Sequence, residues 1–460
     1  MAGSTKKSPK TKAALQKENA QLRRENERLK MACDKAERAG KRQAAPFSKN
    51  SPERNPKKPG RKAGPGYGTK GHRKRPETVD EILDASLPEE CSKCGDGNFV
   101  IDRVAEQYQT EIPEPKPHVR QFNIPVGHCC NCKGRVQGRH PLQTSNALGA
   151  ASSQLGARAV AMATLLQKEL GLSYGKAEKL FKVAFGITVT RGGLVQAIQR
   201  MARRLIPTHE AIVKQLPKEK MVVPDETGWR VNGLPAWLWV FVGVTTVVYK
   251  VATGRGFAEA TKILPASYKG LLVRDGWKVY LSYAGAKHQT CLNHLLARCS
   301  KLLNVAKGGA ARVPHLVRNV LKDALALRDR RDELDPHGFQ VLRGKIVARM
   351  DRLLEWRPSE DENRKLLQHL RTEHEIGAIF RFLESPGLCA TNHLAEQGVR
   401  PAVVNRKVWG GNRTWKGAET QGIIMSVMGT ARMQGLDSLA LMEEAQRSPG
   451  PLILPLVSSG

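Results

Sequence analysis

The stretch MVVPDETGWRV (residues 221–231) decides the fold class of this chain, because a strand-forming apolar run leads directly into acids. Two further apolar runs, WLWVFVG at 237–243 and the segment 245–251, predict an antiparallel hairpin. A third run, LLVRDGW at 271–277, carries Asp275 at the end of its apolar part. An unpaired buried carboxylate is costly, so acids at strand ends indicate a site and not a core. Strands of this kind among helical segments predict a multidomain α/β protein.

The charge of the chain indicates a polyanionic partner. Its 460 residues include 75 Lys and Arg against 43 Asp and Glu, a formal net charge of +32. Such an excess argues against a housekeeping enzyme for small molecules and favours nucleic acid as the partner. Apolar residues make up 40% of the chain, which allows a substantial core and excludes disorder throughout. Aromatic residues at 5% count against a single-strand binder that relies on stacked bases.

We expect a soluble, cytoplasmic protein that associates with the nucleoid. The chain opens MAGSTKK without an apolar leader, so no signal peptide is predicted. The best membrane candidate, residues 236–249, is shorter than the roughly 20 residues that span a bilayer. No membrane partner is therefore predicted.

Residues 12–38 have the pattern of a short coiled coil. Leucine recurs every seven positions, at Leu15, Leu22 and Leu29. Asn19 and Asn26 take the alternate core positions, where a polar side chain lowers stability but fixes register and favours a parallel dimer. A solvated single helix is the alternative interpretation. The pattern predicts a homo-oligomer held by a weak contact.

Residues 39–84 form a basic linker rich in Pro and Gly. Between residues 41 and 75 this segment has many Lys and Arg but a single acid, Glu53. No core can form from such a composition, so we expect a flexible segment that contacts phosphates without reading sequence.

Two CxxC pairs predict a zinc ribbon over residues 85–142. Each pair on a tight turn directs two thiolates at one ion, and two such turns complete a tetrahedral structural site. The four predicted ligands are Cys91, Cys94, Cys129 and Cys132. His128 and Cys130 compete for the fourth position. A site closed by four cysteines has no open position, so this Zn²⁺ is structural and not catalytic.

The segment 143–217 is helical and is predicted to bind DNA. Two short helices flank residues 185–188, as in a helix-turn-helix motif. The second helix carries Arg191, Arg200, Arg203 and Arg204, a distribution that suits docking in the major groove. Many helical bundles share this pattern.

Three separated blocks of sequence carry a family resemblance. DETGWRV with WLWVFVG is followed by LLVRDGW with CLNHLLARC, and then by TNHLAEQGVRPAVVNRKVWGG at 391–411. In this order they resemble the insertion sequence 66 family of DDE transposases over most of the chain. The family's three acids carry over to Asp225, Asp275 and Glu396. The loop at 410–418 departs from the shorter Gly/Ser loop that is common in the family.

The resemblance implies a ribonuclease-H-like core over 218–445, with a helical insertion at about 300–390 and a tail at 446–460. In this interpretation Asp225 bridges two Mg²⁺ ions, which Mn²⁺ can replace, while Asp275 holds one ion and Glu396 the other. Two such ions activate the attacking oxygen and stabilise the leaving one. The implied partners are double-stranded DNA, as element ends and as target, and accessory transposition proteins.

Several basic residues near the acids are candidate DNA contacts. His294 and Arg298 lie in CLNHLLARC, and Arg400, Arg406 and Lys407 follow Glu396. A solvated basic face is the alternative for Arg406 and Lys407, and a salt bridge to Glu396 is the alternative for Arg400.

Other acids after Asp275 lie in charged helical stretches. Asp323, Glu333 and Glu373 have the sequence surroundings of ordinary surface ion pairs.

The sequence therefore predicts a transposase that cleaves and joins DNA strands. Two alternatives remain open: a ribonuclease-H-like nuclease that cuts without joining, and a zinc-ribbon DNA-binding regulator that has lost catalysis. The intact trio of acids argues against the regulator.

Overall fold

The computed structural model describes residues 16, 18–29, 75–149, 153–448, 450 and 452. The chain divides into two compact units, Met1–Ile112 and Pro113–Gly460. This division falls inside the predicted zinc ribbon. Most of the predicted basic linker, from residue 39 to residue 74, lies outside the described residues.

The first unit contains a helix over residues 18–29, within the predicted coiled coil. Leu22 and Leu29 expose 54% and 63% of their surface on this helix, while Leu15 lies outside the described residues. In a coiled coil, a partner helix would cover these exposed leucines. The coiled coil stays a prediction. From 75 to 112 the described backbone forms neither helix nor strand.

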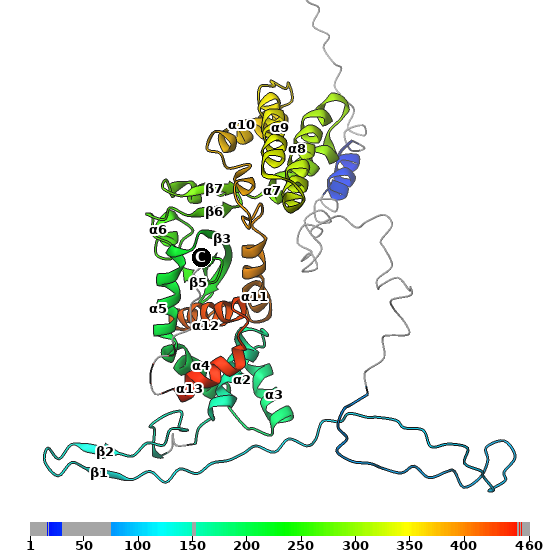
Figure 1. Cartoon of the computed structure of the whole chain (residues 1–460), viewed down its shortest axis with the longest axis vertical. Coiled ribbons are helices and arrows are strands. Elements are labelled where there is room, and N and C mark those ends of the chain that lie inside the picture. The colour runs from blue at the N-terminus through cyan, green and yellow to red at the C-terminus, as the bar shows by residue number, and fades with distance from the viewer. Residues whose placement is uncertain are drawn as a thin grey trace, which may run out of the picture. The chain divides into compact units, whose positions relative to one another are not determined.

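A five-stranded mixed sheet is the centre of the second unit, in the order β5-β4-β3-β6-β7 (Figure 1). β3, β4 and β5 pair antiparallel, whereas β3–β6 and β6–β7 pair parallel. The strands are β3 (Met221–Val231), β4 (Leu234–Val242), β5 (Val247–Ala252), β6 (Leu271–Arg274) and β7 (Lys287–Thr290). The predicted hairpin of β4 and β5 is confirmed.

A second hairpin, between β3 and β4, was not predicted from the sequence. Its turn is Asn232-Gly233, and both residues have positive φ, 53° and 75°. Asn-Gly is the preferred pair for such a two-residue turn, because Gly and Asn tolerate this backbone conformation. The turn lets β3 continue to Val231, well beyond its pairing with β6.

Helices cover both faces of the sheet. Because side chains alternate along each strand, successive residues are buried on opposite faces. Trp239 and Phe241 of β4 pack toward helices α4, α5 and α12, while Leu238 and Val240 pack toward α11. These helices are α4 (Arg191–Arg204), α5 (Ile206–Gln215), α11 (His393–Trp409) and α12 (Trp415–Met433). This two-sided burial explains why WLWVFV is apolar at every position.

The predicted helical region before the sheet is confirmed as helical. α2 (Ala157–Lys168) and α3 (Tyr174–Phe185) precede α4. α3 ends at Gly186, which has a φ of 63°, and the Thr190 hydroxyl accepts a hydrogen bond from the Gly193 amide at the start of α4. Phe181 and Leu194 pack the two helices together.

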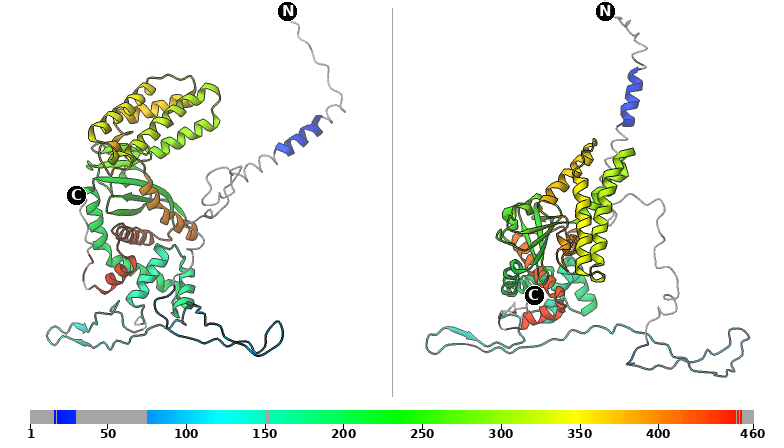
Figure 2. Two further views of the ribbon diagram at one scale, coloured as in Figure 1. Left: turned by 45° about the vertical axis from the view of Figure 1, so that its right-hand side comes forward. Right: turned by 45° about the horizontal axis from the view of Figure 1, so that its top comes forward.

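The segment between Asp275 and Glu396, where an insertion is predicted, is largely helical. Its α-helices begin with α7 (Leu292–Val305) and continue through α8 (Arg312–Asp329), α9 (Pro336–Leu354) and α10 (Asp361–Glu375). The four helices share one apolar cluster, separate from the clusters on the sheet. In the left view of Figure 2 the yellow-green bundle lies above the sheet, apart from the helices that cover it.

Short elements complete the second unit. They are β1 (Val126–His128), β2 (Arg135–Gln137), α6 (Phe257–Ala260), α13 (Ser438–Arg447) and the 3₁₀ turns Leu216–Lys218, Lys278–Ser282, Gly308–Ala311, Arg331–Glu333 and Arg381–Leu383. Within the described part of the chain, no helix has both the length and the apolar composition to cross a bilayer.

Candidate active site

The three predicted acids come from three neighbouring elements of the sheet core. Asp225 lies on β3, Asp275 directly follows β6, and Glu396 lies in the first turn of α11, which packs on β3 and β4. The expectation that Asp225 stands at a strand end is wrong, because it lies inside β3. The parallel pairing of β3 with β6 ends at Val222, just before Pro224, which has no N–H to donate. Asp225 therefore lies where the two strands separate.

The three carboxylates lie within electrostatic reach of one another. Burial raises the pKa of Asp225 to about 7, and repulsion from Glu226, Asp275 and Glu396 adds to this rise. The Glu226 amide donates to Asp225 Oδ1 at 2.8 Å and opposes the rise in pKa. Asp275 Oδ1 accepts from the Trp277 amide at 2.9 Å, which orients its carboxylate.

Substitution of Asp225 by Asn is expected to stabilise the metal-free protein at pH 8. The carboxyl has a pKa of about 7 in the folded chain against its ordinary 3.8, so folding holds this proton more tightly. The resulting stability is complete below about pH 4 and is lost as the pH rises through 7. An amide cannot ionise, so the variant should gain up to about 4 kcal/mol at pH 8 and almost nothing at pH 4. Melting temperatures without divalent ions measure the gain, and equal values at pH 8 would contradict it.

His294 on α7 lies within electrostatic reach of the acids. A hydrogen bond with Cys291 raises the pKa of the imidazole, and the charges of Asp275 and Glu396 raise it further. Arg298 lies one turn along the same helix. Cys291 and Cys299 flank His294 in the sequence, but the three side chains do not form a metal site among the described residues. Burial raises the pKa of Cys299 to about 11, and the Cys291 thiol instead bonds to the Asn392 side chain at 3.0 Å.

The basic residues of α11 differ in their surroundings. Arg406 Nη1 donates to Thr227 Oγ1 at 3.1 Å and to the carbonyl oxygen of Gly228, so this side chain holds α11 on β3. Arg400 and Lys407 are exposed on the helix. DNA contact by His294, Arg298, Arg400, Arg406 and Lys407 stays a prediction.

A network on the opposite side of β3 was missed from the sequence. The Glu226 side chain is 1% exposed and accepts two hydrogen bonds from the Arg255 guanidinium, at 2.8 and 2.6 Å, and one from the Tyr280 hydroxyl. Arg255 also lies over the rings of Trp237 and Trp277, at 4.7 and 3.9 Å. Through Trp277 this network supports the loop that follows Asp275. Adjacent residues of a strand point to opposite faces of the sheet, so the sequence alone could have predicted that Glu226 lies on the face opposite to Asp225.

The carboxylate donors suit a hard divalent cation such as Mg²⁺ or Mn²⁺. Asp225, Asp275 and Glu396 offer oxygen ligands, and their mutual repulsion favours a cation between them. As placed, however, no three His, Cys, Asp or Glu side chains of the described residues are close enough together to chelate an ion. The oxygen donors of Asp225, Asp275 and Glu396 are therefore of the type that Mg²⁺ and Mn²⁺ prefer, but the side chains are not drawn together into a chelating group.

The two CxxC segments each form a tight turn. In the first unit, the Gly95 amide donates to the Cys91 carbonyl at 2.9 Å, and Gly95 has a φ of 77°. In the second unit, β1 and β2 flank Cys129, whose carbonyl accepts from the Lys133 amide at 2.9 Å. Backbone amides that point at the Cys91 and Cys129 sulfurs lower the pKa of both thiols.

A mixed five-stranded sheet with acids on β3, after β6 and on α11 is consistent with a ribonuclease-H-like DDE core. The family profile described as "Transposase IS66 family" matches residues 152–420, more than half of the chain. The chain belongs to this family and carries its DDE transposase domain. Membership implies DNA binding and DNA transposition, and DDE transposases generally use divalent metal ions. No match to a curated protein was found.

Proposed function

We propose that the chain binds the ends of its element and catalyses strand cleavage followed by strand transfer, with Asp225, Asp275 and Glu396 as the catalytic acids. The observation that carries the proposal is the placement of the three acids on neighbouring elements: inside β3, directly after β6, and in the first turn of α11, which packs on β3. Three like charges are costly to hold together unless a cation or a proton offsets them. Mg²⁺ ions would offset this charge, and Asp225, Asp275 and Glu396 are the residues that would hold them.

The bound ions supply charge that activates the attacking oxygen and stabilises the leaving one. The protein's own part is to orient the acids and the DNA. The Trp277 amide fixes the Asp275 carboxylate, and Arg406 fixes the helix that carries Glu396. The charges of Asp275 and Glu396 raise the pKa of His294, and its protonated imidazole would contact a phosphate held beside these acids.

A basic cavity beside Asp275 supports a polyanionic substrate. Its volume is about 820 Å³, and it extends from Gly276 and Lys278 to α10 of the insertion. The cations among its lining residues are Lys278, Arg357, Arg364, Lys365 and Arg371. Phosphodiester contacts in proteins come mainly from such side chains. The insertion would in this way help to hold DNA at the catalytic acids.

The test is an assay with labelled element ends and a target plasmid in Mg²⁺. Nicking at the ends and joined products support the proposal. Cleavage without joining would indicate a nuclease, and specific binding with neither product would indicate a regulator.

We also propose that Cys91, Cys94, Cys129 and Cys132 bind one structural Zn²⁺. The tight turns with amides directed at the first sulfur of each pair favour thiolates, the form that binds zinc. We further propose that the chain forms a homo-oligomer through the predicted coiled coil at residues 12–38.

Cys94→Ser is expected to remove the zinc from the full-length chain. Three remaining thiolates hold the ion far more weakly than four, and ordering of the ribbon depends on the ion. Metal analysis should give one zinc per chain for the wild type and much less for the variant. Cys130→Ser is the matched control and should keep its zinc. Loss in the control but not in Cys94→Ser would assign Cys130 as the ligand instead.

A further inference from the structure

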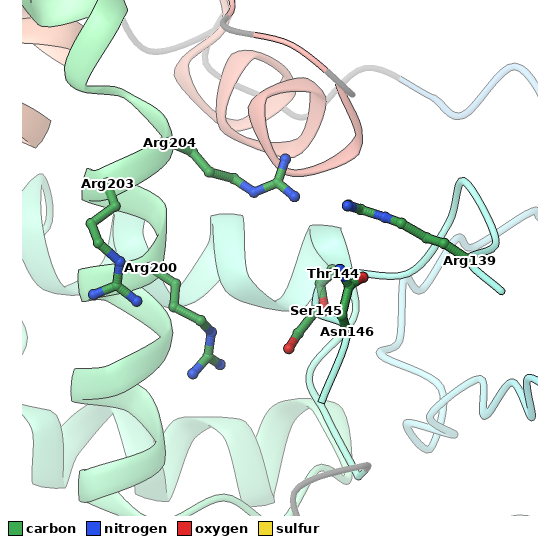
Figure 3. A pocket seen from close by; sticks show the side chains of 7 residues that line it. All are labelled: Arg139, Thr144, Ser145, Asn146, Arg200, Arg203 and Arg204. Atoms are coloured by element: carbon green, nitrogen blue, oxygen red, sulfur yellow. The ribbon is translucent and has the colours of Figure 1, made fainter. Parts of the chain in front are cut away.

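A basic pocket lies in the helical region, remote in sequence from the catalytic acids. Its volume is about 330 Å³ (Figure 3). The lining residues are Arg139, Thr144, Ser145, Asn146, Arg200, Arg203 and Arg204. Four of the seven are arginines and none is acidic. Such a lining lacks an anion to balance its charge.

The helix geometry brings three of these arginines together. Arg200, Arg203 and Arg204 are three and four residues apart on α4, the spacing that places side chains on one helix face. Arg139 comes from the segment after β2, and Figure 3 shows its side chain and that of Arg204 pointing toward one another. Two guanidinium groups directed at each other repel, and burial together with this repulsion lowers the pKa of Arg204.

The opposite wall of the pocket is built by hydrogen bonds. The Thr144 hydroxyl donates to the Leu155 carbonyl at 3.0 Å, and the Asn146 carbonyl accepts from Gln137 Nε2 at 2.9 Å. Arg204 is held from behind, because its Nη1 donates to the carbonyl oxygens of Ala445 and Ser448, at 3.3 and 3.0 Å. These partners are neutral, so they orient the arginine without neutralising it.

The same geometry changes the interpretation of α4. Recognition helices of helix-turn-helix motifs read bases mainly with residues near their N-terminus. Here Arg191, at that end, forms an ion pair with Glu178 at 2.9 Å. The other three arginines, at the C-terminal end, line the pocket instead of a free helix face. Phosphate contact suits them better than base readout.

We propose that this pocket binds a backbone phosphate of duplex DNA and so fixes the position of the helical region on the element. The inference rests on the proposed function, because it assumes that DNA is the ligand. Guanidinium groups bind phosphate oxygens in bidentate pairs, and hydroxyl and amide groups complete such contacts. No aromatic side chain lines the pocket, so a stacked base has no platform there.

The test measures binding of the full-length chain to two fluorescein-labelled duplexes, one with an element end and one of unrelated sequence. Arg139→Gln and Arg200→Gln should each weaken binding to both duplexes roughly tenfold at low salt. Each should also reduce the slope of log affinity against log salt by about 1. Arg330→Gln also removes one arginine charge, from an exposed ion pair with Glu333 that lines neither cavity. It is the matched control and should bind both duplexes as the wild type does.

Unchanged affinity in both pocket variants would overturn the proposal. A second arm measures the thermal shift produced by inorganic phosphate. If that shift disappears in the variants while DNA affinity is unchanged, the pocket is a site for a free anion, and the DNA assignment is wrong. Wild-type protein that binds DNA but neither cleaves nor joins it would contradict the proposed function alone, since the pocket is assessed by binding.

Discussion

Glu396→Gln is expected to lose strand cleavage by on the order of a thousandfold or more, in Mg²⁺ and in Mn²⁺, while folding and DNA binding are kept. The side chain is exposed at the start of α11, so the isosteric amide should not disturb packing. The amide does, however, remove the negative charge that would hold a cation opposite Asp225 and Asp275. Cleavage of labelled element ends at saturating protein measures the loss.

The control for Glu396 is a glutamate whose charge has only a surface partner. Glu333→Gln removes an exposed ion pair with Arg330 at 3.1 Å and should cleave as the wild type does. If Glu396 only forms a salt bridge with Arg400, its variant would cleave DNA at a rate close to that of the control. A variant that fails to fold would also argue for a structural role.

Most of the sheet could be predicted, because β3, β4, β5 and β6 are apolar in local sequence. The edge strand β7 has the polar sequence KHQT and was missed. The β4–β5 hairpin followed from two such runs, whereas the insertion at about 300–390 was implied by the family resemblance. The continuation of β3 was missed, because it depends on the turn at Asn232-Gly233 and on β4 as partner. Asp225 was consequently expected at a strand end.

The site could be predicted in part only. The three acids came from the family resemblance, and no local pattern indicated that His294 would reach them. The expectation of surface ion pairs is confirmed for Asp323, which pairs with Arg349 at 2.7 Å, and for Glu333. It is wrong for Glu373, which is 2% exposed. Its partner Arg274 lies 99 positions earlier in the chain, and helical spacing cannot reveal such a contact.

The pair of Arg274 and Glu373 joins β6 to the insertion. Arg274 is fully buried at the end of β6, directly before Asp275, and Glu373 lies on α10. Two parallel hydrogen bonds connect the side chains, Nη1 to Oε1 at 3.2 Å and Nη2 to Oε2 at 2.6 Å. The Thr290 hydroxyl on β7 donates to the same carboxylate. A shift of α10 would therefore be transmitted to Asp275.

Glu373→Gln is expected to lower the free energy of unfolding by about 3–5 kcal/mol, because it leaves a buried guanidinium without a counter-charge. Chemical denaturation measures the loss. Asp323→Asn, which breaks an exposed pair in the same insertion, is the control and should change stability by less than about 1 kcal/mol. If Glu373→Gln does not fold, the double variant Arg274→Met, Glu373→Leu removes both charges and should regain most of the stability, since apolar side chains can replace a buried pair. The cleavage rate of the double variant distinguishes two roles of the pair. Slow cleavage by a stable double variant would mean that the ion pair orients Asp275. Full activity would mean that the pair only stabilises the fold.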